Sequence, residues 1–186
     1  MILNSDFFNR DSLIVWKELL WKKFNFIDSS WYKFSGIINE VEIYKWTEDE
    51  ASHAYTGKTP RNKVMFETFW HIYVYFVYGM YNCLNFTTEK TWTPGAILIR
   101  SIIPIDGIEK MLQNRKTKNL SNLTNWPAKL CQALWIDKSL YWKKLCTKNK
   151  IFTEDINYKI KTPILEWPRI GISKAQDKNW RFWFKN

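Results

Sequence analysis

The feature that most constrains the fold is a pair of apolar, aromatic-rich segments joined by a very short connection. Ile72 to Tyr78 and Asn82 to Thr87 contain many of the β-branched and aromatic residues that favour strands. The turn Tyr78-Gly79-Met80-Tyr81 joins them, and its glycine can adopt the unusual backbone dihedral that a tight turn requires. The pattern predicts an antiparallel β-hairpin.

The tip of this hairpin carries aromatic and sulfur-containing side chains, although hairpin tips are normally polar. Two interpretations are open. In the first, the hairpin folds back so that its tip joins the core. In the second, it protrudes as a wedge that inserts between the base pairs of a nucleic acid.

A second predicted strand, Ile37 to Tyr44, places polar and apolar side chains on opposite faces. Val41 and Ile43 point to one face, whereas Glu42 and Tyr44 point to the other. Because alternate residues of a strand lie about 7 Å apart, Glu42 and Tyr44 are expected to be neighbours.

A third predicted strand, Ala96 to Ile102, is strongly apolar but contains Arg100. A buried charge without a partner is costly, so this arginine needs a carboxylate or a phosphate beside it. The carboxylate of Glu42 is its natural partner.

Four further segments are predicted to be helical from their apolar spacing and capping residues. They are a first helix containing Leu13, Trp16, Leu20 and Phe24 and capped by Asp11 or Ser12, a short helix from Thr47 to Tyr55 with Thr47 as its N-cap, and the segments Gly107 to Arg115 and Ala128 to Leu134. Loops are predicted at Gly57 to Asn62 and at Lys116 to Asn125, Leu140 to Ile160 is ambiguous, and Trp180-Arg181-Phe182 is predicted to form a closing strand.

The charge of the chain favours a polyanionic partner. It has 28 basic and 18 acidic residues, a net charge of +10, which suits nucleic acid or an anionic membrane. Aromatic residues make up 18% of the chain, more than a domain of this size can bury, and exposed aromatic rings can stack on bases. A membrane partner is disfavoured, because the first predicted helix lacks a clean polar face and no run of about 18 apolar residues occurs.

Length and cysteine content limit the remaining classes. A chain of 186 residues is expected to form one domain spanning residues 1–186. Cys83, Cys131 and Cys146 show no C-x-x-C spacing, which argues against a disulfide framework or a zinc site and favours a reducing compartment. Charged residues near the N-terminus argue against a signal peptide. We expect no metal and no cofactor.

Eight short blocks extend along nearly the whole chain. They are EVEIY at 40–44, DEASHAYTGKTPRN at 49–62, MF at 65–66, YVYFVYGMYNCLN at 73–85, AILIR at 96–100, KLCQAL at 129–134, PRIGI at 168–172 and WRF at 180–182. In this order they resemble the alkyladenine (3-methyladenine) DNA glycosylase family. One such block is weak evidence, whereas eight in sequence are specific.

The resemblance implies a compact α+β domain with a curved antiparallel sheet, a protruding β-hairpin and flanking helices. It implies a base-excision repair enzyme that flips an alkylated or deaminated purine out of double-stranded DNA and hydrolyses its N-glycosidic bond. Water is then the nucleophile and no lysine acts as a lyase, so the enzyme is monofunctional. The resemblance also implies a monomer without a membrane partner in the bacterial cytoplasm, associated with the nucleoid when bound to DNA.

The resemblance assigns the chemistry to two residues. Glu42 matches the general base that accepts a proton from the attacking water and stabilises the oxocarbenium-like state. Arg100 matches an arginine that helps to place this water and pairs with the carboxylate.

The resemblance also implies a pocket for the flipped base. Tyr44, His53 and Tyr75 match residues that stack on the base, and aromatic faces favour a cationic alkylated purine by roughly 1–2 kcal/mol. Asn85 matches a residue that crowds the purine 2-position and so disfavours guanine.

DNA contacts are implied at and near the hairpin. Tyr78 matches the residue that intercalates through the minor groove and fills the gap left by the flipped nucleotide. Thr59, Arg61, Met80 and Tyr81 match positions near the DNA backbone or the opposite strand.

The chain departs from the family pattern where glycines are expected. Phe69-Trp70-His71-Ile72 stands where glycine usually precedes the YVY strand, Trp126-Pro127-Ala128 replaces a Gly-Pro-Gly-like turn, and Trp135 replaces a glycine. These departures concern local turn geometry and stability, and none affects a predicted catalytic or base-binding residue.

A second hypothesis is a non-catalytic, basic and aromatic nucleic-acid-binding protein derived from the same fold. Such a protein needs affinity for nucleic acid but not the combination of Glu42 and Arg100. The presence of both residues favours the enzyme.

Overall fold

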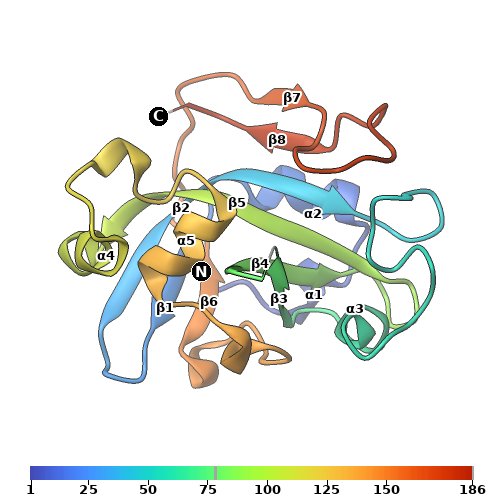
Figure 1. Ribbon diagram of the computed structural model, residues 1–186, viewed down its shortest axis with the longest axis horizontal. Helices are drawn as coiled ribbons and strands as arrows, with labels where there is room; N and C mark the ends of the chain where they lie inside the picture. The colour runs from blue at the N-terminus through green and yellow to red at the C-terminus, as the bar shows by residue number, and fades with distance from the viewer. Residues whose placement is uncertain (78, 186) are drawn as a thin grey trace.

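A single antiparallel sheet dominates the computed structural model, which describes residues 1–77 and 79–185 (Figure 1). The elements are α1 (Ser5–Phe8), α2 (Ser12–Leu19), β1 (Lys23–Ile27), β2 (Lys33–Tyr44), α3 (Lys63–Glu67), β3 (Ile72–Val77), β4 (Tyr81–Thr88), β5 (Gly95–Asp106), α4 (Ile108–Arg115), α5 (Pro127–Leu134), β6 (Ile151–Glu154), β7 (Leu165–Trp167) and β8 (Arg181–Trp183). Short 3₁₀ turns lie at Leu120–Asn122, Lys138–Leu140 and Thr147–Asn149. The mixture of strands and helices is the α+β class expected from the sequence.

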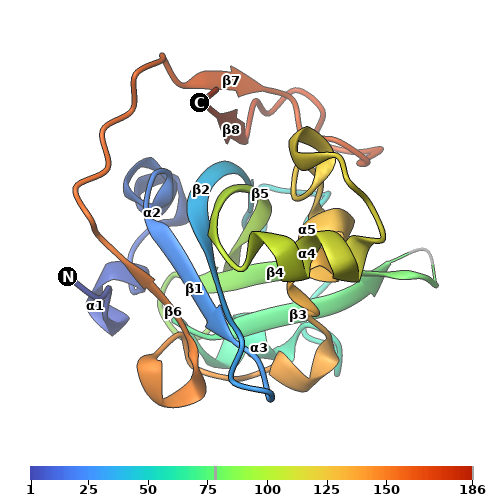
Figure 2. The same ribbon diagram turned by 90° about the vertical axis from the view of Figure 1, so that its left-hand side faces the viewer.

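The main path through the sheet follows the order β3-β4-β5-β2-β1-β6, and every pairing is antiparallel. The long strands β2 and β5 form its centre, with Glu42 opposite Leu98 and Tyr44 opposite Ala96. The sheet is strongly curved in both views (Figures 1 and 2). Its concave arrangement brings the ends of β2, β3 and β4 around a common space.

Strand β2 has different neighbours at its two ends. Its first half pairs with β1, whereas Glu40 to Glu42 pair with β8, which also pairs with β7. Register shifts on either side of Glu40 mark a β-bulge in its pairing with β5. Bulges bend and twist a strand, so this one lets the C-terminal segment close beside the end of β2 that carries Glu42 and Tyr44.

Helices cover both sides of the sheet. α2 packs on β2 and β5, and α5 packs on β4 and β5 beside α4. Figure 2 shows α2 and α5 on opposite sides of these strands. The main hydrophobic core joins the apolar faces of these elements, and a smaller cluster lies under α3: Ala54, Val64, Met65, Phe66, Tyr73 and Ala96.

The predicted hairpin is present and projects from the body of the molecule (Figure 2). Val77 pairs with Tyr81, the amide of Met80 donates to the carbonyl of Val77, and Gly79 has a φ of +64°. Met80 is 66% exposed and Tyr81 is 42% exposed, so the interpretation in which this tip joins the core is wrong. Tyr78 lies outside the described residues.

The first helix is shorter than its apolar spacing predicts. α2 ends at Leu19, Leu20 adopts extended dihedrals, and Phe24 lies in β1. Leu20 and Phe24 are nevertheless fully buried. The helical spacing continued by chance into a strand whose alternate residues face the same core.

The predicted helix from Thr47 to Tyr55 is wrong, because this segment forms a series of turns. Thr47 has a φ of +56°, which is not the extended conformation of an N-cap. The carboxylate of Asp49 accepts hydrogen bonds from the amides of Lys45 and Ala51. Side-chain hydrogen bonds of this kind offer the backbone an alternative to a helix.

The other boundaries differ only in extent. β2 and β5 extend beyond their predicted ranges, and the ambiguous segment from Leu140 to Ile160 contains β6. α4, α5, the loop at Gly57 to Asn62 and the closing strand β8 agree with prediction. None of the described helices has the length and apolar character needed to cross a bilayer.

Candidate active site

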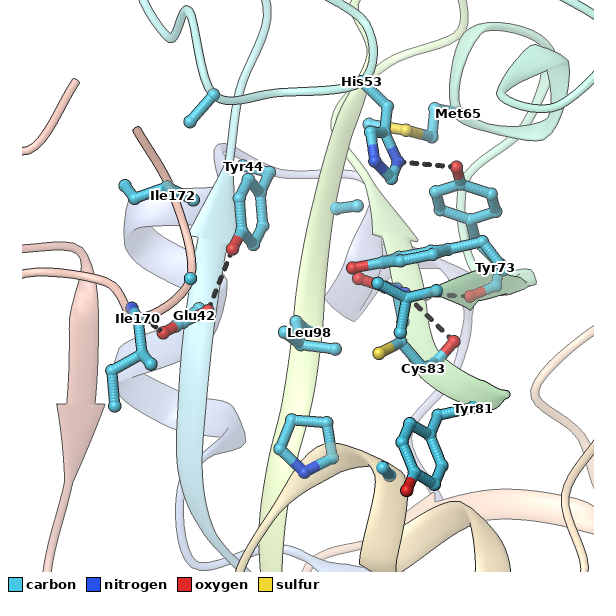
Figure 3. Close-up of a pocket in the computed structure, with 18 of the residues that line it drawn as sticks. Glu42, Tyr44, His53, Met65, Tyr73, Tyr81, Cys83, Leu98, Ile170 and Ile172 are labelled. Carbon is cyan, nitrogen blue, oxygen red and sulfur yellow. Dashed lines mark hydrogen bonds between the residues drawn. The ribbon is translucent and has the colours of Figure 1, made fainter. Parts of the chain in front are cut away.

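A cleft of about 220 Å³ opens between the ends of β2, β3, β4 and β5, the start of α5 and the C-terminal loop (Figure 3). In Figure 3, Glu42 and Tyr44 lie on one side of this cleft, and His53 and Tyr73 lie on the other. The lining includes Glu42, Tyr44, His53, Arg61, Tyr75, Tyr81 and Asn85 of the predicted site residues. The fold therefore brings together residues from five separate segments of the chain.

Glu42 is a fully buried carboxylate with three hydrogen-bond or ionic partners. Its Oε2 accepts a hydrogen bond from the Tyr44 hydroxyl at 2.9 Å, and its Oε1 accepts one from the amide of Ile170 at 2.8 Å. Arg100 Nη1 lies 3.0 Å from the same Oε1. Donors of this kind stabilise negative charge and fix the orientation of the carboxylate.

Arg100 is buried and pairs with two carboxylates. The pairing with Glu42 was predicted, and the second partner is Glu40, whose Oε1 lies 2.7 Å from Arg100 Nε. Burial alone would lower the pKa of Arg100, but the carboxylates of Glu42 and Glu40 raise it above its ordinary value. Arg181 also pairs with Glu40, at 2.9 Å. The guanidinium of Arg100 therefore bridges two acids and remains charged.

Tyr44 contacts both Glu42 and the C-terminal loop. Burial raises the pKa of its hydroxyl well above the ordinary value, and the neighbouring charge of Glu42 raises it further. The hydroxyl thus stays protonated and remains a donor to Glu42. The Arg169 guanidinium lies 4.8 Å from the centre of the Tyr44 ring.

The opposite side of the cleft consists mainly of aromatic rings, with the exposed Arg61 beside them. The rings of His53 and Tyr75 meet edge to face at 4.6 Å, and His53 Nδ1 lies 2.8 Å from the Tyr73 hydroxyl. Burial, with a smaller contribution from the charge of Arg61, lowers the pKa of His53 to about 4. His53 is therefore neutral at pH 7, as are the tyrosines. This side offers flat faces without a competing positive charge on the imidazole.

Asn85 and Cys83 lie in β4, at the inner part of the cleft. The Asn85 amide donates to the carbonyls of Tyr73 and Cys83, which holds the side chain in place. Burial raises the pKa of the Cys83 thiol to about 11, so it is neutral at pH 7.

The predicted DNA-contacting residues lie at the mouth of the cleft or outside it. Arg61 is exposed, with its guanidinium 5.1 Å from the centre of the Tyr75 ring, and Tyr81 lines the rim. Met80 and Thr59 are exposed but do not line the cleft. Their contacts with DNA stay predictions.

Sequence reasoning gave no role to several residues that organise the site. They are Glu40, Asp49, Tyr73, Arg169 and the backbone amide of Ile170. One usable signal was the scarcity of arginine, six residues against 22 lysines, because a fork-shaped donor is then expected only where it is needed. Arg169, in the PRIGI block, is such a case.

Among the described residues, no group of three or more histidine, cysteine, aspartate or glutamate side chains is arranged to hold a metal ion. The lining of the cleft, within the same part of the chain, also contains no lysine. The charged groups at the cleft are thus the buried acid with its arginine, and the exposed Arg61.

Comparison with known proteins gave consistent matches. A family model described as methylpurine-DNA glycosylase (MPG) matches residues 6–186. A protein of Prosthecochloris aestuarii is 41% identical over 176 residues, which cover 95% of this chain and 84% of the relative. A protein of Clostridium perfringens strain SM101 is 40% identical over 199 residues, covering 100% of this chain and 97% of the relative. Both relatives are named "Putative 3-methyladenine DNA glycosylase".

Proposed function

The chain belongs to the methylpurine-DNA glycosylase family and is a DNA glycosylase for alkylated bases, and we propose that it hydrolyses the N-glycosidic bond of a purine flipped out of double-stranded DNA. The proposed substrates are alkylated or deaminated purines. The observation that carries this proposal is the fully buried Glu42 carboxylate beside a cleft whose opposite side is aromatic.

The proposed reaction begins when the flipped nucleotide places its sugar next to Glu42. A water molecule attacks the anomeric carbon, Glu42 accepts a proton from it, and the bond from that carbon to the purine nitrogen breaks. The free base leaves with the bonding electron pair. Glu42 also stabilises the positive charge that develops on the sugar, and Arg100 holds the carboxylate in place.

The aromatic side of the cleft supports selection of damaged bases. The purine would lie between Tyr44 on one side and His53 with Tyr75 on the other. A purine alkylated at N3 or N7 carries a positive charge, which aromatic faces attract and a neutral His53 does not repel. Asn85, held by two backbone carbonyls, would crowd a group at the purine 2-position and so disfavour guanine.

The projecting hairpin and the basic charge support binding to duplex DNA. Tyr78 is proposed to enter the stack where the nucleotide has left, while Thr59, Arg61, Met80 and Tyr81 contact the backbone or the opposite strand. A net charge of +10 makes such binding depend strongly on salt. The enzyme is proposed to act as a monomer.

The cleft supports a reaction without strand cleavage. A lyase step needs an amine that attacks the sugar, and no lysine is found among the described residues that line the cleft. We therefore assign water as the nucleophile.

The test is a base-release assay on duplexes that carry alkylated adenine, hypoxanthine or no lesion. The native chain should release free base from damaged duplex and leave an abasic site with intact strands. Glu42→Gln should slow release about 10²–10⁴-fold, the usual contribution of a general base, while lesion binding persists. Glu18→Gln is the matched control, because Glu18 lies at the surface in an exposed pair with Arg10.

Two outcomes would contradict the proposal. Normal turnover by Glu42→Gln would remove Glu42 from the reaction. Tight DNA binding by the native chain without any free base would favour the non-catalytic binding protein instead.

A further inference from the structure

One fully buried ion pair lies next to the proposed catalytic acid without touching the cleft. Arg169 and Asp49 have no exposed side-chain surface. Arg169 Nη1 lies 2.6 Å from Asp49 Oδ2, and Nη2 lies 2.7 Å from Oδ1, so the contact is bidentate. Removing two charges from water is expensive, which raises the question of what this pair does.

The pair joins the C-terminal loop to the end of β2 and to the turn that follows β2. Arg169 Nη1 also donates to the carbonyl of Ile43 at 2.8 Å, next to Tyr44 in β2. Asp49 accepts from the amides of Lys45 and Ala51, which fixes the turn after β2. Arg169 itself belongs to the C-terminal loop. The end of β2, the turn and the loop are thus tied at one point.

This arrangement controls the surroundings of Glu42. The residue after Arg169 is Ile170, whose amide donates to Glu42 Oε1. The Arg169 guanidinium also lies against the Tyr44 ring, whose hydroxyl donates to Glu42 Oε2. Two of the three partners of Glu42 are therefore placed by Arg169.

We propose that Arg169 and Asp49 are a positioning pair that orients Glu42 by presenting the Ile170 amide and the Tyr44 hydroxyl to it. The inference rests on the proposed role of Glu42. The pair acts through these two donors and does not itself contact the substrate.

The variant that tests this is Arg169→Lys, which keeps the charge but loses the bidentate geometry. We expect kcat to fall tenfold or more, with little change in the affinity for lesion DNA. Because an amide donor favours an ionised carboxylate, the acid limb of the kcat profile should also move to higher pH. Arg10→Lys is the matched control, since Arg10 makes a bidentate contact with Glu18 at the surface.

The double variant Asp49→Leu/Arg169→Met covers the case in which Arg169→Lys does not fold, because it leaves no charge unpaired. It should show the same loss of kcat and the same shift of the acid limb. A folded variant with the native kcat and pH profile would overturn the positioning role alone. Failure of the native chain to release any base would overturn the proposed function and this inference with it.

A second, independent observation concerns tryptophan. Six tryptophans have a φ between +58° and +72°: Trp21, Trp31, Trp70, Trp92, Trp135 and Trp142. This region is unfavourable for residues with a Cβ atom and is the usual place of glycine. The chain has 12 tryptophans but only six glycines.

The left-handed backbone conformation of these tryptophans costs much conformational free energy. At about 1–2 kcal/mol for each residue, six such conformations cost about 6–12 kcal/mol. A typical domain is stable by only about 5–15 kcal/mol. Burial offers little in return at Trp31, Trp92 and Trp135, which are 73%, 58% and 65% exposed.

The hydrogen bonds at Trp135 are those of a glycine cap. Its amide donates to the carbonyls of Cys131 and Gln132, at the C-terminal end of α5. A left-handed residue that ends a helix in this way is most often glycine.

We infer that these six positions are built for glycine and that glycine occupies them in the organism that makes the protein. The codon UGA is read as tryptophan in some bacteria and as glycine in others. The six positions are then encoded by UGA codons, which the source organism reads as glycine.

Two measurements test this inference. Peptide mass spectrometry of the protein from its source should find glycine at all six positions, and the gene should carry UGA there. UGG codons, or tryptophan in the peptides, would overturn it.

The physical basis is tested by thermal unfolding. Trp135→Gly and Trp31→Gly should each raise the Tm, whereas Trp16→Gly should lower it, because Trp16 is buried in α2 and stacks on Phe182 at 3.5 Å. Lower Tm values for Trp135→Gly and Trp31→Gly would contradict the assignment.

Discussion

The two sides of the cleft are built on different principles. The acidic side consists of Glu42, Glu40 and Arg100, whose positions depend on ion pairs of 2.7 to 3.0 Å. The aromatic side consists of His53, Tyr73 and Tyr75, which are neutral at pH 7 and held by ring contacts. The rings that would contact the flipped base are thus neutral, and the charge on that side is the exposed Arg61 guanidinium, 5.1 Å from the centre of the Tyr75 ring. The comparison predicts that changes on the acidic side affect rate and stability most, while changes on the aromatic side affect selection.

The largest effect is expected from Arg100→Met. It leaves the buried Glu42 and the partly exposed Glu40 close together with one fewer partner, so the free energy of unfolding should fall by about 3–5 kcal/mol. Base release should be lost as well. Urea unfolding and single-turnover assays measure the two effects. Arg10→Met, at an exposed pair, should cost about 0–1 kcal/mol; equal losses would erase the difference between the two sites.

A smaller and more selective effect is expected from Tyr75→Ala. Loss of an aromatic face should weaken binding of a duplex with a cationic alkylated purine by about tenfold, equivalent to roughly 1–2 kcal/mol. Binding of a neutral hypoxanthine lesion should change less, and Tyr75→Phe should behave as the native chain. Fluorescence anisotropy with matched duplexes provides the affinities. A uniform loss for both lesions would show that this side does not select by charge.

The pH dependence of stability should reveal the lowered pKa of His53. Its pKa is about 4 in the folded protein and about 6.5 when unfolded, so between these values the unfolded chain binds more protons. The stability that comes from burying a neutral His53 is complete above pH 6.5 and is lost as the pH falls toward 4. Urea midpoints at pH 7 and pH 5 should therefore differ less in His53→Gln than in the native chain. If the difference between the two midpoints were the same in His53→Gln and in the native chain, His53 would lie in a more polar setting than this cleft.

The smallest effect is expected at the rim. Arg61→Gln should weaken DNA binding only a few-fold and reduce the slope of log affinity against log salt concentration by about one. Binding titrations at several salt concentrations measure this slope. An unchanged slope would mean that Arg61 makes no phosphate contact.

The acidic side was the more predictable of the two from sequence. Alternation along β2 places Glu42 and Tyr44 on one face, and a buried Arg100 requires an anion, so local rules predicted these three residues but not the second partner, Glu40. The missed turn from Thr47 to Tyr55 depends instead on Asp49, whose partner Arg169 lies 120 residues away. No local pattern encodes that contact. The end of α2 was missed for a related reason, since a buried strand continued its apolar spacing.

The pairing of β8 with β2, and of β7 with β8, has a consequence for chains that end early. A product that stops before β7 retains the hairpin, the aromatic rings and most basic residues, but it lacks Arg169 and the Ile170 amide. In such a fragment Glu42 would lose the hydrogen bond from the Ile170 amide, and the Tyr44 ring would lose the guanidinium that lies against it. The segment synthesised last therefore completes the surroundings of the proposed catalytic acid.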